Sequence, residues 1–458
     1  MRIRLCLAAT LLLLGACALS ARAETPPNLV VFFLDDSGWA DFHPFGDPPY
    51  PTPNMERMAR EGTRFTQFYV PQAVCSASRA SLLTGCYPGR TKITGALSPD
   101  ARGLERDIPT LAEILKPRGY ATGLFGKWHL GDQPDTRPRA RGFDETCGIM
   151  YSNDMWAGHP ENPKLWGKKP LQYYENDDVV IASVTAEDQK TFTQRFTRAA
   201  VSFIERHKAE PFFLYVPHPQ PHVPLFCSPE FEGKSGAGLY GDVIMELDWS
   251  LGQILDALDA AGVTDNTLVL FTSDNGPWHV YGNHAGKTPY REAKGTSFDG
   301  GTRSACIARW PGKIPADTVS EAVWSTLDLA PTFATLAGVS LSGDDVDGKD
   351  VWPLVSGAPG ATNPHEAYFL STGPKLEAVV SGDGRWKLHL PHKYRVVEHY
   401  GSDGKSGKYT QEGIGLSLYD LDADPVESRN VLDAHPEIAA RLKALAEEHR
   451  ATYYNRPE

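Results

Sequence analysis

The chain reads Asn28-Leu29-Val30-Val31-Phe32-Phe33-Leu34 near its start, and Asp35-Asp36 follow directly. Six apolar residues in succession are typical of a strand that is buried on both faces, as in the centre of a parallel sheet. Further strands are expected at 65–69, 121–125, 212–216 and 268–272, and helices between them at 53–61, 108–115, 192–207 and 241–261. This alternation predicts an α/β fold with a large mixed, mostly parallel sheet flanked by helices.

The pattern changes near residue 365. Two strand candidates, 378–381 and 385–388, flank Gly382-Asp383-Gly384, which is a hairpin signal. Another strand is expected at 416–421 and a closing helix from 436 to about 450. We therefore expect a main domain at 24–365 and a smaller C-terminal α+β unit, built on an antiparallel sheet, at 366–458. The stretch 132–186 is rich in Pro, Trp, Gly and charged residues, and long irregular loops are expected there.

The first 23 residues have the features of a secretory signal. Arg2 and Arg4 precede an apolar run from Leu5 to Leu14, and small residues lead to Ala23. Leu14-Gly15-Ala16-Cys17 also resembles a lipoprotein processing site, in which Cys17 would carry the lipid, and both cleavages stay open. No later apolar stretch is long enough to span a bilayer. Export is expected, to the periplasm, to the outer membrane as a tethered lipoprotein, or to the medium.

Charge and cysteine content limit which binding partners and cross-links are expected. The 458 residues carry a net charge of −12, which becomes −15 when Arg2, Arg4 and Arg22 leave with the signal. Such a surface repels nucleic acid and anionic membranes, so an anionic substrate needs a local cationic pocket. Beyond the signal and Cys75, discussed below, the remaining cysteines fit no zinc spacing, and at most one disulfide is expected among Cys86, Cys147, Cys227 and Cys306.

Polar residues follow four of the predicted strands. Ligands of open α/β sheets bind beyond the carboxyl ends of the strands, so these residues are expected at one rim. Any one of them alone is more simply explained as turn chemistry or as a solvated loop residue. The residues are Asp35 and Asp36, Lys127 and His129, His218 and His222, and Asp274 and Asn275.

The segment Cys75-Ser76-Ala77-Ser78-Arg79 carries the most specific signal. Helix-like residues from Ser78 to Leu83 follow it, which would set Cys75 at a helix N-terminus, where anions are favoured. An ordinary buried or disulfide-bonded cysteine is the simpler alternative. Together with Gly126-Lys127-Trp128-His129, Pro217 to Pro224 and Lys294-Gly295-Thr296, the segment resembles the formylglycine-dependent sulfatase family of the alkaline phosphatase superfamily, in particular its arylsulfatase and N-acetylgalactosamine-6-sulfatase branch. The family has proline where this chain has Ala77, a position read by the maturation enzyme.

The resemblance implies an alkaline-phosphatase-like fold and a catalytic domain at 24–365. It implies that a formylglycine-generating maturation enzyme converts Cys75 to an aldehyde, whose hydrate has one hydroxyl that attacks sulfur and a second whose deprotonation releases sulfate. It also implies one calcium ion per chain, because an all-oxygen ligand set suits Ca²⁺ better than Mg²⁺. The implied ligands are Asp35, Asp36, Asp274, Asn275 and modified Cys75.

The same resemblance implies roles for the basic residues. Arg79 and Lys127 would hold the hydrated aldehyde, and His129 would take the proton whose loss ejects sulfate. Lys294 and His222 would contact the sulfate and the leaving oxygen, and Ser152 would support them. With Ca²⁺, three aspartates and three cationic side chains, the pocket has a net charge of +2, which suits a sulfate ester.

These observations predict an exported sulfuric ester hydrolase that acts on a sulfated small molecule, most plausibly a sulfated saccharide, with endo or exo action left open. The alternatives are a phosphoester or phosphonate ester hydrolase of the same superfamily and a catalytically silent binding protein. Candidate specificity residues, each also explicable as a solvated basic residue, are His159, Lys164, Lys168, Lys169, Lys387, His389, His392 and Lys393.

Overall fold

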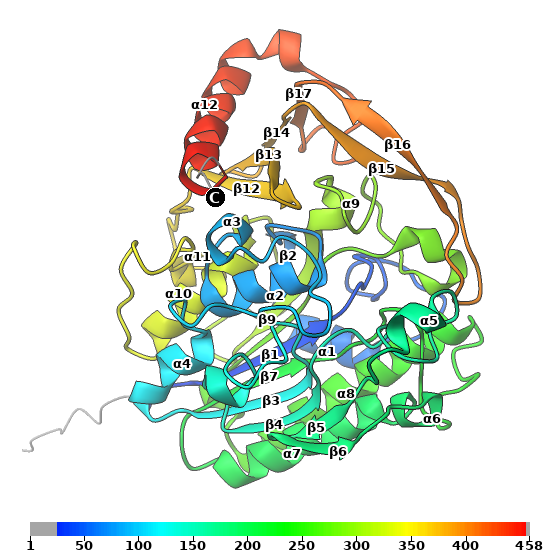
Figure 1. Cartoon of the computed structure of the whole chain (residues 1–458). Coiled ribbons are helices and arrows are strands. Elements are labelled where there is room, and N and C mark those ends of the chain that lie inside the picture. The colour runs from blue at the N-terminus through cyan, green and yellow to red at the C-terminus, as the bar shows by residue number, and fades with distance from the viewer. Residues whose placement is uncertain (1–24, 455–458) are drawn as a thin grey trace, which may run out of the picture.

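The computed structural model describes residues 25–454 and shows a layered α/β structure beneath a smaller sheet (Figure 1). The predicted secretory signal at 1–23, with Cys17, lies outside the described residues. Among the residues described, no helix combines the length and the apolar character that crossing a membrane would need.

The main sheet is mixed and mostly parallel, as predicted. Its strands are β1 (Asn28–Leu34), β2 (Thr63–Tyr69), β3 (Ala121–Lys127), β4 (Glu145–Ile149), β5 (Tyr173–Glu175), β6 (Asp178–Ile181), β7 (Phe212–Pro217), β8 (Thr267–Ser273), β9 (Arg303–Arg309), β10 (Thr318–Ser320) and β11 (Trp324–Ser325). Within residues 25–454 their order is β10-β2-β9-β8-β1-β7-β3-β4-β5-β6, with β11 beside β2. Strand β1 is buried throughout and pairs in parallel with both β7 and β8, so its apolar run has neighbours on both edges.

Helices cover both faces of this sheet (Figure 1). On one face, α1 (Pro53–Arg60), α7 (Phe192–His207) and α8 (Leu239–Ala261) pack together. On the other, α2 (Cys75–Thr84), α4 (Leu111–Leu115) and α10 (Leu329–Leu336) do so. The shorter helices are α3 (Pro88–Thr91), α5 (Pro163–Trp166), α6 (Ala186–Gln189), α9 (Asp299–Thr302) and α11 (Trp352–Val355).

Two sequence expectations for the main domain are wrong. The stretch 132–186 is not only loop, because it contains β4 and the β5–β6 pair. β4 escapes an apolar search because a glycine stands where it pairs with β3: a Cβ on Gly148 would lie 1.8 Å from the Gly126 oxygen. Helix α4 begins three residues later than predicted, since Thr110 and Glu113 form a capping box.

The C-terminal region forms a smaller antiparallel sheet. β12 (Ala367–Thr372), β13 (Lys375–Ser381), β14 (Trp386–His389) and β17 (Ser417–Asp420) pair in that order, and α12 (Pro436–Tyr453) packs against it. The predicted hairpin around Gly382-Asp383-Gly384 is confirmed as the β13–β14 pair. A separate ribbon consists of β15 (His392–His399) and β16 (Lys408–Ile414). The domain boundary between 365 and 366 stays a prediction.

Buried charges join the small sheet to the main domain. Lys387 of β14 donates to Asp299 at 2.7 Å and to Glu427 at 3.2 Å, and His389 Nε2 lies 2.6 Å from Glu427. These four side chains are fully buried. Burial opposes ionisation of Glu427, but Lys387 and His389 hold its pKa down at about 2. The network is therefore an ionic contact between β14 and the start of α9.

The cysteines of the described chain are not cross-linked. The five cysteines in the described part of the chain, Cys75, Cys86, Cys147, Cys227 and Cys306, are unpaired and buried. The structure therefore shows no disulfide between them.

Replacing Lys387 tests the ionic contact. Lys387→Met should lower the free energy of unfolding by about 3–5 kcal/mol, because it leaves Asp299 and Glu427 buried without their shared cation. Thermal or denaturant unfolding measures this loss. Lys443→Met, which removes an exposed pair with Glu447, is the control and should leave the midpoint unchanged. Equal midpoints for both variants would show that the buried network contributes no stability.

Candidate active site

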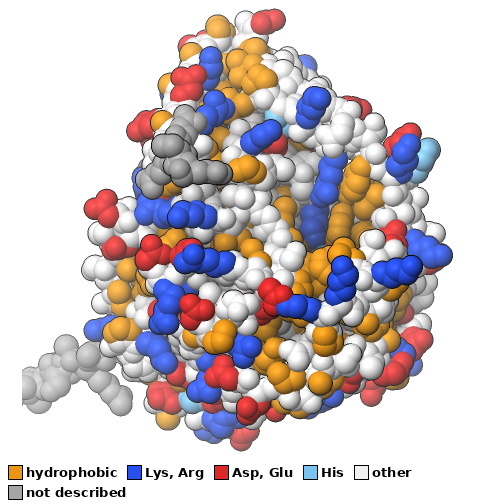
Figure 2. All heavy atoms as spheres, in the orientation of Figure 1, with side chains coloured by type: hydrophobic (Ala, Val, Ile, Leu, Met, Phe, Trp, Pro, Cys, Tyr) orange, Lys and Arg blue, Asp and Glu red, His pale blue; other side chains and the backbone are white. Residues whose placement is uncertain are grey.

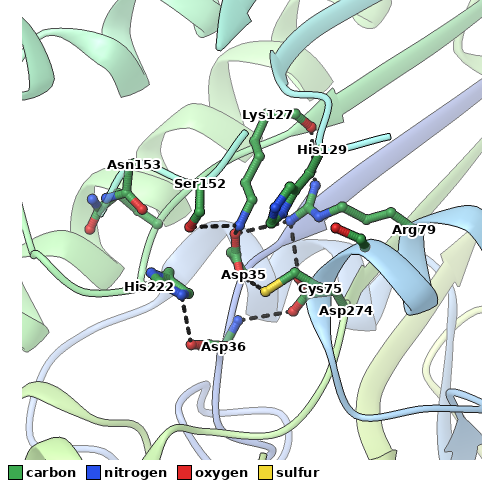
Figure 3. Close-up of polar contacts among 12 residues, drawn as sticks. Asp35, Asp36, Cys75, Arg79, Lys127, His129, Ser152, Asn153, His222 and Asp274 are labelled. Carbon is green, nitrogen blue, oxygen red and sulfur yellow. Dashed lines mark hydrogen bonds and ion pairs between the residues drawn. The ribbon is translucent and has the colours of Figure 1, made fainter. Parts of the chain in front are cut away.

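Polar residues from neighbouring strands meet at one edge of the main sheet (Figure 3). β1 leads into Asp35 and Asp36, β3 ends at Lys127, and β8 leads into Asp274. Because β1 pairs with β7 and β8, and β7 with β3, the carboxyl ends of these strands lie side by side. Helix α2 completes the group, since Cys75 is its first residue.

Cys75 lies in the middle of this group and is 2% exposed. Its Sγ is 3.5 Å from Asp35 Oδ1 and 3.4 Å from Lys294 Nζ. Burial, together with the nearby Asp35 carboxylate, raises the pKa of the Cys75 thiol. The encoded thiol is therefore protonated, and this environment does not favour a thiolate nucleophile. The first turn of α2 instead offers free N–H groups, which favour an anion.

Asp35 is the most strongly paired carboxylate of the site. Its Oδ2 accepts a hydrogen bond from Lys127 Nζ at 2.5 Å and lies 3.1 Å from Arg79 Nη2, which also donates to Asp274 Oδ2 at 3.1 Å. Burial opposes ionisation, but Lys127 and Arg79 outweigh it and hold the pKa of Asp35 well below its usual range. Burial and the charge of Asp35 raise the pKa of Asp274 to about 8. Asp35 is thus paired with two of the three cationic side chains of the site.

Asp36 is turned toward β8 by a left-handed backbone conformation with φ of 64°. Lys294 Nζ reaches both of its carboxylate oxygens at 2.7 Å. The side-chain amide of Asn275 donates to Asp36 Oδ1 at 2.7 Å, and the Asp36 backbone N–H donates to Asp274 Oδ1 at 3.1 Å. Burial nevertheless raises the pKa of Asp36. The nearby cations therefore do not fully offset the effect of burial on Asp36 and Asp274.

This cluster has the properties of a site for a hard cation. Asn275 Oδ1 is buried and finds no hydrogen-bond partner among residues 25–454. Asp35, Asp36, Cys75 and His222 each present a ligand atom, and these atoms lie within 4.8 Å of one another. Carboxylate and amide oxygens are the ligands that Ca²⁺ prefers. Three buried carboxylates, two of them with raised pKa values, and a free amide oxygen therefore fit a divalent cation.

Lys127 and His129 approach the cluster from the end of β3. Lys127 Nζ also donates to Ser152 Oγ at 3.1 Å. His129 Nε2 lies 2.9 Å from the Leu97 carbonyl oxygen, which can only accept, so Nε2 carries the proton and Nδ1 the lone pair. His129 Nδ1 is buried and lacks a partner within the described chain. Burial and Lys127 lower the pKa of His129, so its ring is neutral and can accept a proton at Nδ1.

His222 and Lys294 approach from the opposite side. His222 Nδ1 is 2.5 Å from the Val223 carbonyl oxygen, which leaves the lone pair on Nε2, 3.6 Å from Asp36. Burial and the nearby Lys294 lower the pKa of His222. Burial alone would lower the pKa of Lys294, but Asp36 raises it, so the ammonium keeps its proton. Of these two side chains, Lys294 is the charged donor.

Two other predicted positions are held by contacts of their own. His218 is buried between Phe32 and Phe196, and its Nε2 contacts Ser250. His159 Nδ1 accepts hydrogen bonds from backbone N–H groups of its own loop.

The hypothesis that Lys387 and His389 select the substrate is wrong, because both are fully buried in the network with Glu427. His392 is partly buried, and its Nε2 lies 3.6 Å from Glu377 Oε2. The candidates that do reach the surface are Lys164, Lys168, Lys169 and Lys393.

The side chains of the site are almost fully buried, with Cys75 2% and Lys294 6% exposed. Figure 2 shows a hollow beside α2 and α5, with basic and hydrophobic side chains along its walls.

Trp278, beside Lys294 and His222, was missed by the sequence analysis, since a tryptophan after a turn carries no signal of its own. Arg395 and Tyr409, more than a hundred residues downstream of Lys294, also contact this region and have no sequence signal.

Comparisons with known proteins agree on one family. The family model described as Sulfatase matches residues 27–339. Arylsulfatase A of Bos taurus is 37% identical over 445 residues, covering 93% of this chain and 87% of the relative. The N-acetylgalactosamine-6-O-sulfatase of Bacteroides thetaiotaomicron is 33% identical over 487 residues, covering 92% of each. The solved PsFucS1 sulfatase from Pseudoalteromonas sp. superposes with a TM-score of 0.85 at 25% identity, covering 94% of this chain and 92% of that one.

Proposed function

The chain belongs to the sulfatase family, with its alkaline-phosphatase-like fold, and is therefore a sulfuric ester hydrolase; from this premise we propose that it cleaves a sulfate ester of a sulfated carbohydrate, using formylglycine at position 75 and one calcium ion. The observation that supports this most is the surroundings of Cys75. A buried thiol with a raised pKa lies at a helix N-terminus beside cations and carboxylates. That environment suits an anionic substrate and a converted nucleophile better than a thiol.

Conversion of Cys75 by a maturation enzyme supplies a hydrated aldehyde, whose hydroxyl can act as a nucleophile at neutral pH. Around it, the chain's own residues hold charge and protons. Arg79 and Lys127 bring positive charge to the side where negative charge develops. His129 Nδ1 accepts the proton whose removal precedes sulfate release, while its Nε2 stays hydrogen-bonded to Leu97.

Calcium would be held by Asp35, Asp36, Asp274, Asn275 and the modified Cys75. When bound, it draws electron density from the sulfate group. Lys294, 3.4 Å from Cys75 Sγ, contacts the sulfate and can protonate the leaving oxygen. His222, whose Nε2 lies 3.6 Å from Asp36, would contact the leaving oxygen beside it. A single oxygen-ligated cation with lysines differs from the paired metals typical of phosphatases, which disfavours the phosphoester alternative. The relatives named as sulfatases disfavour the phosphonate alternative. Because the set of acid, base and cationic groups is complete, a silent binding protein is also disfavoured.

Two observations support a sulfated carbohydrate as the substrate: the name of a relative and the exposed basic residues of this chain. The Bacteroides relative is named for a 6-sulfated amino sugar. A carbohydrate sulfate has hydroxyls that polar and basic surface residues can bind, and Lys164 and Lys168 are exposed candidates for such contacts. Export through the signal at 1–23 would bring the enzyme to sulfated saccharides outside the cell, in the periplasm, on the outer membrane or in the medium. Sulfate release from a panel of sulfated mono- and oligosaccharides tests this assignment, and it is wrong if no member is cleaved faster than an aryl sulfate.

The converted residue can be detected directly. Peptide mass spectrometry of active protein should show an aldehyde in place of the CH₂SH group at Cys75. Cys75→Ala should abolish turnover with little effect on the unfolding midpoint, because the side chain is small. Cys147→Ala removes another buried thiol, remote from the cluster, and should keep activity. Full activity in protein that carries only the unmodified thiol would refute this mechanism.

Removal of a carboxylate tests the metal. Asp35→Asn and Asp274→Asn should each weaken calcium binding by roughly ten- to hundredfold or more, as measured by calorimetry, with a parallel loss of activity. Asp256→Asn, which breaks a surface pair with Arg57, is the control. Stoichiometric zinc in the native protein, or full activity after exhaustive chelation, would contradict the calcium assignment.

The proposed roles of His129 and Lys294 predict different kinetics. In His129→Ala, alcohol release should stay faster than sulfate release, giving a burst of up to one equivalent of alcohol per active site before a slow steady state. In Lys294→Ala no burst is expected, because its charge meets the sulfate before and during attack. Quenched-flow measurements with a chromogenic aryl sulfate compare the two. Burst-free losses of equal size in both variants would show that this division of roles is wrong.

A further inference from the structure

The β15–β16 ribbon extends from the C-terminal region back toward the site (Figure 1). Its far end is attached to the main domain: the backbone N–H groups of Gly401 and Gly407 both donate to the Val280 oxygen, at 2.8 and 2.9 Å. Ser406 Oγ donates to Glu161 at 2.7 Å. A two-stranded ribbon alone is marginally stable, so these contacts hold it against the main domain.

Arg395 of β15 holds the main chain at Lys294. Its Nη2 and Nε donate to the Lys294 carbonyl oxygen at 2.5 and 3.2 Å. Gly295 makes this approach possible, because a Cβ there would lie 2.0 Å from Arg395 Nη2. Gly295 also has a φ of 79°, which other residues rarely adopt. The chain at this point is therefore shaped to receive the guanidinium group.

Tyr409 of β16 holds the ring that faces the Lys294 ammonium. Lys294 Nζ lies 4.2 Å from the centre of the Trp278 ring, on which it makes a cation–π contact. Trp278 Nε1 donates to the Tyr409 hydroxyl at 3.0 Å. The Arg395 guanidinium stacks on the Tyr409 ring, 4.8 Å from its centre. One pair of ribbon residues thus reaches both the backbone and the side chain of Lys294.

We propose that Arg395 and Tyr409 are positioning residues for Lys294, which makes the β15–β16 ribbon part of the catalytic apparatus although it contributes no catalytic residue. The inference rests on the proposed role of Lys294. A lysine side chain has four rotatable bonds, and holding it in one arrangement is costly in entropy. The Trp278 ring and the fixed carbonyl restrict the ammonium to the side of Asp36 and Cys75, where it can meet a sulfate without reorganising.

A double-mutant cycle tests this inference. Tyr409→Phe keeps the ring but leaves Trp278 Nε1 without its acceptor, and should lower kcat/KM for an aryl sulfate by about three- to tenfold. In the Lys294→Ala background the same substitution should change kcat/KM by less than about twofold, because the group that it positions is gone. Calorimetric binding of inorganic sulfate to Cys75→Ala protein, with and without Tyr409→Phe, should show the same loss without turnover.

Controls separate this inference from the function on which it rests. Tyr400→Phe changes an exposed side chain at the turn of the same ribbon and should leave kcat/KM unchanged. Arg395→Lys provides a second variant and should also lose activity, because an ammonium cannot make both hydrogen bonds to the carbonyl. Equal losses from Tyr409→Phe in both backgrounds, or no loss at all in the unmutated background, overturn the positioning role. Unchanged kcat/KM in Lys294→Ala alone instead overturns the proposed role of Lys294.

Discussion

Three buried carboxylates and three buried cations share one end of the central sheet, and the balance between their pairing and the cost of their burial shapes the site. Asp35 is paired with Lys127 and Arg79, whereas burial raises the pKa values of Asp36 and Asp274. Such a cluster is costly to bury unless every charge has a partner. The left-handed turn at Asp36 and the free oxygen of Asn275 become understandable if a divalent cation completes the set.

The position of Cys75 depends on the same balance. Its sulfur lies between Asp35 and Lys294, at the first turn of α2, in surroundings that keep a thiol protonated. A sulfate group brought to this point would meet N–H groups and cationic side chains that are already in place. The protein is acidic overall, with a net charge of −12. Its site nevertheless suits an anion, because positive groups are buried together there.

The C-terminal region is bound to this site by two kinds of contact. Lys387, Asp299 and Glu427 form a buried ionic contact with the start of α9, a few residues after Lys294. The β15–β16 ribbon contacts Lys294 and Trp278 through Arg395 and Tyr409. Residues far apart in sequence thus restrain one loop of the site from two directions.

The sequence was sufficient to predict those features of the protein that depend on residues close together along the chain. Apolar runs predicted β1, β7 and β8, and polar residues after strands predicted which side chains share a rim, because parallel strands end at the same edge. The segment at Cys75 indicated the family through its own residue types. In contrast, β4 was missed because its one glycine, Gly148, stands where an apolar side chain would be expected and where β4 pairs closely with β3. Other features depend on contacts between groups that are distant in sequence, and no spacing along the chain encodes such contacts. They are the burial of Lys387, the tautomer of His129, which the Leu97 carbonyl sets, and the contacts of Arg395 and Tyr409 with the Lys294 region.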